Sequence, residues 1–296
     1  MGIFGFESTV ILIALIIGSV FDIKSREIPD ILSFCLVGFA MFYGLVASII
    51  LSDYFILLSK LIGFIIAGII GLALYFLGQW GGGDAKIIMG IGAMIGIDLF
   101  GFDAGFGSVG VPSLAIFLLN TIFMGAIYGF FWLFFISFVR FNEFRKEFRS
   151  VRRAPVYTKI RKYVLLGCAL FVLVILFINI PETFKILLIL FAFFAVLAFY
   201  SSMFVKSVEN GILIKRISVG KLTEGDWVVG KVRLPNGRFF KPARTGITRQ
   251  DIETLKKSGI RNVVVKEGIP FVPSFLLAYI VTVAIGNWPV IITGLL

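Results

Sequence analysis

The sequence contains no histidine among its 296 residues and only two cysteines, Cys35 and Cys168. The absence of histidine excludes nucleophiles activated by a histidine base, HExxH zinc sites and haem ligation by histidine. The cysteines lie far apart within apolar segments and form no CxxC pattern, so neither a zinc site nor a disulfide framework is indicated. We expect both to behave as small buried hydrophobic residues.

Charged residues are also scarce, at 15% of the chain, whereas 59% of the residues are hydrophobic and 34 are phenylalanine. Soluble globular domains contain about 45–50% apolar residues. The composition therefore predicts an integral membrane protein. The first apolar segment contains Glu7 in place of a basic leading region and has no small-residue cleavage pattern. It is predicted to be a retained transmembrane helix.

Eight segments are apolar and long enough to cross a bilayer, which takes roughly 20 residues. They cover residues 6–22, 31–51, 56–78, 85–100, 113–138, 163–180, 184–204 and 271–294. The predicted fold is an all-α polytopic membrane protein of about eight transmembrane helices. The fourth segment is short and rich in glycine, so we expect it to be tilted or closely packed.

The positive charges segregate to one side of this predicted topology. Of the 28 lysine and arginine residues, all but Lys60 and Lys185 lie on one side: between spans one and two, at the entrance to span four, between spans five and six, or between spans seven and eight. This side is predicted to be cytoplasmic, which leaves both termini outside. The two exceptions lie near helix ends, where a lysine can snorkel to water.

The net charge of +11 does not indicate a nucleic-acid partner. The basic residues flank the predicted spans and lack the interleaved aromatic residues on which bases stack. The basic loop at residues 140–162 is expected to set the topology and to contact anionic membrane lipids.

Residues 206–268 form the one long polar stretch and separate a membrane domain, residues 1–205, from a final helix within residues 269–296. Short β segments are predicted at residues 211–218, 226–234 and 261–267, with a turn at residues 235–237. A helix is predicted between Thr248, as its N-cap, and Gly259. We therefore expect a small cytoplasmic α+β domain. Its sequence does not choose between a regulatory, a substrate-guiding and a structural role.

Ionisable groups at membrane depth are costly and mark candidate functional sites. Asp98 lies at the outer end of the fourth span, where water can reach it, and Asp30 follows Pro29 as a predicted N-cap of the second helix. Asp22 ends the first span and Asp84 opens the fourth, so the predicted topology puts both carboxylates at the cytoplasmic face.

Two neighbouring carboxyl groups cannot both ionise easily, so one can act as general base on a water molecule while the other acts as general acid. That is the chemistry of aspartic proteases. Ion-coupled transporters also bury aspartates, as ligands for cations. From their positions alone, Asp22 and Asp84 are compatible with either class.

Three motifs carry a resemblance to a known family. Residues 22–29 read DIKSREIP, residues 81–86 read GGGDAK, and residues 268–273 read GIPFVP at the start of the last span. In their order and predicted topology they resemble the type IV prepilin peptidase family, most closely its archaeal preflagellin and prepilin peptidases.

The resemblance implies a GxGD aspartyl endopeptidase that removes the basic leader from prepilin-like or preflagellin substrates at the cytoplasmic membrane face. It implies Asp22 and Asp84 as the catalytic pair, and no metal ion or organic cofactor. Gly81, Gly83, Arg26 and Lys86 match the surrounding motifs as supporting residues.

The charge of such a leader suggests where it would bind. A basic leader is repelled by the basic loops, so Glu27 and Asp30, beside the predicted catalytic pair, are the candidates for contact with it. Glycines 81–83 are expected to let the backbone turn between helices and to leave an open surface for an extended substrate. Lys86 either tunes the pair or marks the cytoplasmic end of its helix.

Overall fold

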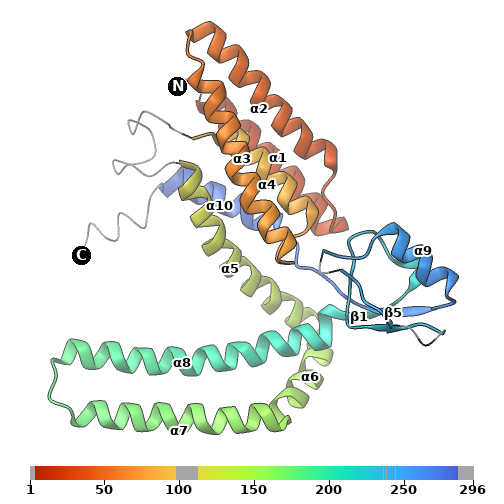
Figure 1. The fold of residues 1–296 in the computed structure, drawn as a ribbon. Helices are drawn as coiled ribbons and strands as arrows, with labels where there is room; N and C mark the ends of the chain where they lie inside the picture. The colour runs from red at the N-terminus through yellow and green to blue at the C-terminus, as the bar shows by residue number, and fades with distance from the viewer. Residues whose placement is uncertain (1–3, 98–112, 236, 238, 244, 286–296) are drawn as a thin grey trace. The chain divides into compact units, whose positions relative to one another are not determined.

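The structure is a computed structural model in which residues 4–97, 113–235, 237, 239–243 and 245–285 are described. Helices make up most of it (Figure 1). They are α1 (Phe4–Ser25), α2 (Asp30–Leu51), α3 (Phe55–Phe76), α4 (Gly82–Ile95), α5 (Ser113–Val139), α6 (Phe141–Arg153), α7 (Pro155–Phe177), α8 (Glu182–Val208), α9 (Arg249–Lys257) and α10 (Val272–Ile285). The strands are β1 (Ile214–Ser218), β2 (Trp227–Val228), β3 (Val232–Arg233), β4 (Phe239–Phe240) and β5 (Asn262–Lys266).

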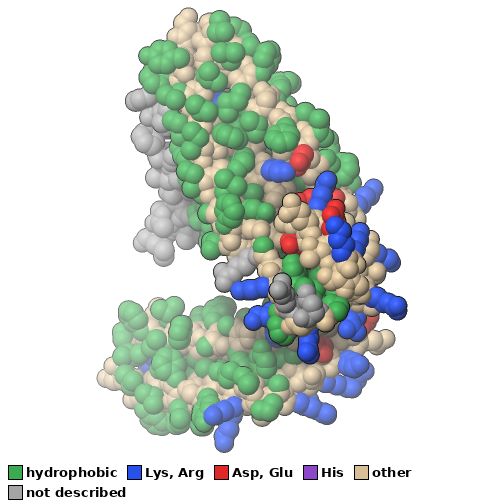
Figure 2. Space-filling model, turned by 45° about the vertical axis from the view of Figure 1, so that its right-hand side comes forward, with side chains coloured by type: hydrophobic (Ala, Val, Ile, Leu, Met, Phe, Trp, Pro, Cys, Tyr) green, Lys and Arg blue, Asp and Glu red, His purple; other side chains and the backbone are tan. Residues whose placement is uncertain are grey.

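Six of these helices, α1, α2, α3, α5, α7 and α8, are long and apolar enough to cross a membrane. The chain is therefore a multi-pass membrane protein, as its composition predicts. Hydrophobic side chains cover much of the visible helical surface (Figure 2). Phe138 and Phe177 are 77% and 84% exposed, as residues facing lipid would be.

The predicted count of eight spans is not confirmed. The fourth predicted span forms α4, which has only 14 residues and a length of about 21 Å, short of a hydrocarbon core of about 30 Å. Its predicted outer end, including Asp98, lies outside the described residues. The last predicted span forms α10, with 14 residues described, and residues 286–294 of that span lie outside the description.

The chain divides into two compact units. One consists of residues 1–131, 218–263 and 268–296, and the other of residues 132–217 and 264–267. The predicted boundaries at residues 205/206 and 268/269 separate membrane segments from a polar domain, whereas this division follows packing. The predicted domains therefore stay a prediction.

Helix α4 lies inside the first unit, packed against α2 and α3. The contact with α3 is so close that a Cβ on Gly63 would lie 2.2 Å from the Gly92 carbonyl oxygen, and one on Gly92 would lie 2.3 Å from Ala67 Cβ. Small residues thus allow the two backbones to approach. The expectation of close packing from the glycine-rich sequence is confirmed. Fully buried Ile87, Ile88 and Ile91 place the core around this helix.

Lys60 corrects one prediction from the sequence. It does not snorkel from a helix end, because its side chain is only 7% exposed. Its Nζ lies 2.6 Å from Glu7 Oε1 and also donates a hydrogen bond to the Met94 carbonyl. A buried ion pair of this kind satisfies both charges within the protein, so Lys60 joins α3 to α1 and to the end of α4.

Helices α6, α7 and α8 belong largely to the second unit, in which α7 and α8 form a hairpin (Figure 1). The predicted loop at residues 140–162 is wrong as a description of the backbone, since α6 and the first turns of α7 cover nearly all of it. Phe148 of α6 packs with Val151, Phe199 and Met203, so the apolar face of α6 lies on α8. In the sequence, Phe141, Phe144 and Phe148 recur at helical spacing, and this pattern indicates an amphipathic helix.

The predicted polar stretch contains strands and the expected helix, but the segment predicted at residues 226–234 forms two separate strands, β2 and β3, and β4 lies outside the predicted segments. Strands β1, β5 and β2 make a three-stranded sheet in that order, and β3 pairs antiparallel with β4. Helix α9 starts after Thr248, whose hydroxyl accepts the Asp251 N–H, and Gly259 follows it with a φ of +71°. The predicted first strand begins later than expected, because residues 209–213 continue the helix as a π turn.

The cysteines differ from their prediction. Cys35 on α2 is exposed and Cys168 on α7 is half-buried, so neither is a core residue of the described protein. Both lie on apolar spans, where lipid supplies the hydrophobic surroundings that the prediction assigned to a protein core.

Candidate active site

Asp22 lies near the end of α1 and is 6% exposed. Its Oδ2 accepts a hydrogen bond of 2.9 Å from the backbone N–H of Val272, the first residue of α10. The first N–H groups of a helix have no partner within that helix, and a carboxylate is one of the groups that satisfy them. Asp22 therefore fixes the start of α10 while its own position is fixed by α1.

Arg26 ties the same two segments together a turn later. It adopts the left-handed conformation, with a φ of +59°, and its N–H donates to the Asp22 carbonyl at 3.0 Å, which ends α1. Its guanidinium donates to the Gly268 carbonyl. The first and third sequence motifs thus meet in space, although 250 residues separate Asp22 from Val272.

Asp84 lies in the first turn of α4 and is half-buried. Its Oδ2 accepts the N–H of Gly81 at 2.9 Å, and the Gly81 carbonyl accepts the N–H of Ala85 at 3.2 Å. The side chain thus satisfies the N–H of the residue that precedes its own helix. This local bond sets the direction of the carboxyl group at the start of α4.

The two aspartates lie within direct electrostatic reach of each other. Close packing around them explains how α1, α4 and α10 converge. A Cβ added to Gly18, one turn before Asp22, would lie 3.0 Å from Ile87 Cδ1 on α4 and 3.2 Å from Val272 Cγ1 on α10. Three helices distant in sequence therefore bring two carboxylates and one helix N-terminus to one place.

The glycines of the second motif have a different role from the one predicted. None of residues 81–83 has a positive φ, and the left-handed turn between α3 and α4 falls earlier, at Gly78 with a φ of +70°. Gly83 is needed for close approach, because a Cβ there would lie 3.0–3.2 Å from Ile28 side-chain atoms. The open Gly82 position next to it has its nearest neighbour, Tyr75 Cε2, at 3.8 Å.

The other predicted residues divide into paired and unpaired groups. Lys86 Nζ lies 2.6 Å from Asp30 Oδ1. Asp30 is the first residue of α2 and makes no capping bond, so its prediction as an N-cap is wrong. Glu27 is exposed, and its carboxylate has no hydrogen bond or ion pair to any described residue.

Sequence reasoning missed the wall of the site formed by α5 and α10. Half-buried Tyr128 of α5 lies within electrostatic reach of Asp22 and Arg26. One turn earlier, a Cβ on Gly125 would lie 2.7 Å from the Phe271 ring, which in turn packs against Trp80 with centroids 5.8 Å apart. Phe271 lies in the third motif, but aromatic residues are so frequent in this chain that nothing in the sequence distinguished Tyr128 or Trp80.

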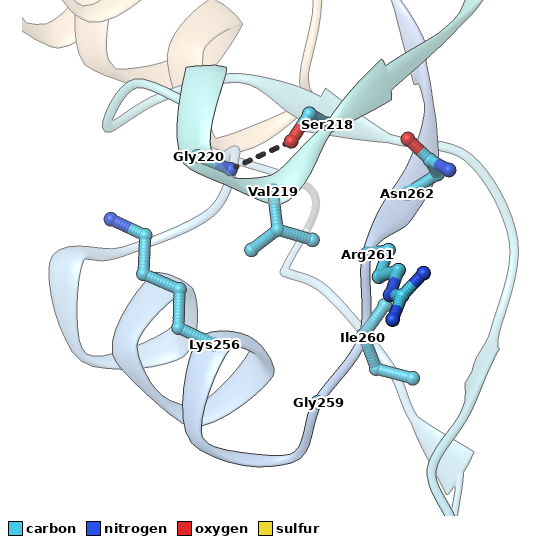
Figure 3. A pocket seen from close by; sticks show the side chains of 8 residues that line it. All are labelled: Ser218, Val219, Gly220, Lys256, Gly259, Ile260, Arg261 and Asn262. Carbon is cyan, nitrogen blue, oxygen red and sulfur yellow. Dashed lines mark hydrogen bonds between the residues drawn. The ribbon is translucent and has the colours of Figure 1, made fainter.

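No group of three or more acidic, cysteine or histidine side chains that could hold a metal ion occurs in the part of the chain that the structure describes. A separate hollow beside α9 is lined by Lys256 and Arg261 (Figure 3). In its wall the Gly220 N–H donates to Ser218 Oγ at 3.3 Å, and the Val219 N–H donates to the Arg261 carbonyl at 3.0 Å. These exposed side chains form no arrangement suited to catalysis.

Comparison with known proteins bears on the segment that contains both aspartates. Residues 9–130 match the model of the type IV leader peptidase family. We call these residues, which make up less than half of the chain, the leader-peptidase segment. It includes α1 to α4, with the first two motifs, and most of α5.

Curated relatives of this leader-peptidase segment are preflagellin peptidases. Those of Methanocaldococcus jannaschii and Methanococcus maripaludis are 41% and 42% identical over 83 residues, and that of Methanococcus voltae is 43% identical over 88 residues. Each match covers 28% of this chain and 35–36% of the relative, about a third of its length. No solved structure matches the chain significantly.

Proposed function

We propose that this protein is an aspartyl endopeptidase that removes the basic leader peptide from prepilin-like or preflagellin substrates. The observation that carries the proposal is the convergence of Asp22 and Asp84, from α1 and α4, within the leader-peptidase segment. The names of its relatives give the substrate class.

The proposed chemistry uses the two carboxyl groups in different protonation states. The ionised member takes a proton from a water molecule, whose oxygen attacks the scissile carbonyl carbon. The protonated member donates to the carbonyl oxygen, and the tetrahedral intermediate breaks down when the leaving amide nitrogen receives a proton. No step in this scheme calls for a metal ion or an organic cofactor.

The surrounding motif residues hold this pair in place. Arg26 and the capping bond from Val272 fix Asp22, and the Gly81 N–H fixes Asp84. Gly83 admits Ile28 beside the pair. Accurate placement of reacting groups accounts for much of enzymatic rate enhancement, so each of these residues is a positioning residue in our proposal.

The distribution of positive charge supports a cytoplasmic site, with both termini outside. A leader would then approach from the cytoplasm while the hydrophobic stem of the substrate stays in the membrane. Glu27 and Asp30, both exposed and adjacent to the pair, are the proposed contacts for its basic residues. Residues 206–268 are proposed as a cytoplasmic domain and residues 269–296 as containing a final span.

An ion-coupled transporter remains the rival reading of the same aspartates. It would require broken helices near the middle of the membrane that present backbone carbonyls to a cation. In the described residues Asp22 and Asp84 lie instead at a helix end and a helix start, each bonded to a backbone N–H. A carboxylate that accepts N–H groups suits a dyad better than a cation cage.

Cleavage of a reporter tests the proposal directly. The full chain in lipid vesicles is incubated with a preflagellin-like reporter, and the products are analysed by mass spectrometry and N-terminal sequencing. We expect one cut between the basic leader and the hydrophobic stem. A reporter that stays intact with folded protein, or is cut elsewhere, would overturn the proposed function.

A further inference from the structure

The ion pair between Lys86 and Asp30 joins the second motif to the start of α2. It is short, at 2.6 Å, yet both side chains are accessible, with 43% of Lys86 and 58% of Asp30 exposed. Lys86 lies two residues after Asp84 on the same helix. The pair thus forms part of the accessible surface beside the two aspartates, not of the buried core.

Lys86 also shows what the Asp30 carboxylate accepts. Its ammonium group is the same chemical group that a lysine in a basic leader would offer. Asp30 is the proposed leader contact, but its Oδ1 is already occupied by a cation from within the chain. Two ammonium groups on one carboxylate repel each other, so a leader lysine gains most from Asp30 when Lys86 gives up Oδ1.

The exchange of partners is energetically cheap. Exposed ion pairs contribute at most about 1 kcal/mol, since water solvates both charges well and long side chains lose freedom when they are held. A second acid, Glu27, precedes Asp30 by three residues in the sequence; it is exposed and its carboxylate is unpaired among the described residues. An ammonium group from the leader can therefore gain Glu27 before it competes for Asp30.

We propose that the Lys86–Asp30 ion pair is a specificity device in which a basic leader residue displaces Lys86 from Asp30 on binding. This inference rests on the proposed function and deepens it. A leader without positive charge cannot replace Lys86 and leaves the Lys86–Asp30 ion pair intact. Glu27 and Asp30 then differ in role, since Glu27 binds directly whereas Asp30 binds by exchange.

The experiment measures binding, so that changes in the rate of chemistry do not enter it. The full chain carrying Asp84→Asn is placed in lipid nanodiscs and titrated with a fluorescent synthetic leader peptide that contains lysine, or with the same peptide with lysine replaced by glutamine. Lys86→Met removes the internal competitor, so we expect it to lower the Kd of the lysine peptide about two- to fivefold. The glutamine peptide should show no change.

A double-mutant cycle supplies the decisive control. Asp30→Asn should raise the Kd of the lysine peptide, and in its presence Lys86→Met should have no further effect, because no carboxylate remains to be contested. Glu27→Gln should weaken the lysine peptide equally with or without Lys86. Arg249→Met, which breaks the comparably short 2.8 Å surface pair with Glu224, serves as the matched control and should change nothing.

The outcomes separate this inference from the function on which it rests. If the lysine peptide binds but Lys86→Met leaves its Kd unchanged or raises it, the exchange is wrong and the peptidase proposal stands. If neither peptide binds and the wild-type chain leaves the reporter intact, the function itself fails. If Lys86→Met tightens both peptides alike, Lys86 acts by a route other than exchange at Asp30, and the inference is overturned.

Discussion

Helix α1 carries one carboxylate near each end, and the two have opposite kinds of partner. At one end, buried Glu7 faces Lys60 at 2.6 Å, and the Lys60 ammonium also binds the Met94 carbonyl at the end of α4. At the other end, buried Asp22 lies within electrostatic reach of a second carboxyl group, Asp84, in the first turn of α4. Helices α1 and α4 are thus linked at one end through Lys60 of α3, an attractive partner for Glu7, and bring two like groups together at the other.

The two ends of α1 therefore have different roles, one in stability and one in the proposed chemistry. A compensated buried pair is strongly destabilised when one partner is removed, so it fixes how helices pack. Two carboxyl groups side by side gain nothing in stability from each other, and such pairs are retained where a shared proton is useful. The Glu7–Lys60 pair is therefore interpreted as a clamp, and Asp22 with Asp84 as the proposed reactive pair.

The largest expected effect is on cleavage, at the end of α1 where Asp22 lies near Asp84. Asp22→Asn or Asp84→Asn keeps the shape and hydrogen-bonding capacity of each side chain but removes its acid–base function. We expect each to lower the rate of reporter cleavage by about 10³-fold or more. Thermal unfolding in detergent should change little. Asp53→Asn, at the N-H of Phe55 in the connection before α3, is the matched control and should cleave normally.

At the clamp the expected effect is on stability. Glu7→Gln or Lys60→Met leaves one charge buried without its partner, so we expect each to destabilise the folded protein by about 3–5 kcal/mol. The double variant Glu7→Leu with Lys60→Met should recover most of this loss, because it replaces both charges with apolar groups. Unfolding followed by intrinsic tryptophan fluorescence measures it. Equal losses in the single and double variants would contradict the clamp.

The smallest expected effect is a difference in cleavage rate between substitutions at the two glycines that precede Asp84. Gly83→Ala forces a Cβ to within 3.0–3.2 Å of Ile28, so we expect cleavage to slow by about three- to tenfold as α4 shifts. Gly82→Ala meets only an ordinary contact at 3.8 Å and should keep the wild-type rate. Initial rates on the reporter, at matched protein levels, separate them. Comparable rates in the two variants would show that Gly83 does not position the site.

The sequence predicted the features whose signals are local. The bounds of α9 were predicted because Thr248 is a typical N-cap residue and Gly259 is a typical left-handed residue after a helix end. The apolar spans follow from composition over about 20 residues. Asp22 and Asp84 stood out because each interrupts the end of such a span within a known motif.

The features that were missed depend on contacts between distant residues. Lys60 and Glu7 are 53 residues apart, so hydropathy alone suggested snorkelling where the fold provides a buried partner. The bond from Val272 to Asp22 could not be read from either segment by itself. The predicted span count is not confirmed at α4, because a short helix packed against α2 and α3 has the same apolar composition as one that faces lipid.

The central claim is that Asp22 and Asp84 act as one unit, and non-additivity tests it most directly. Cleavage rates are measured in long incubations for Asp22→Asn, Asp84→Asn and the double variant, with Asp53→Asn as control. Members of one catalytic unit lose nearly all activity when either is removed, so we predict the same residual rate in all three dyad variants. Losses that multiply in the double variant, or substantial activity in either single variant, would contradict the account.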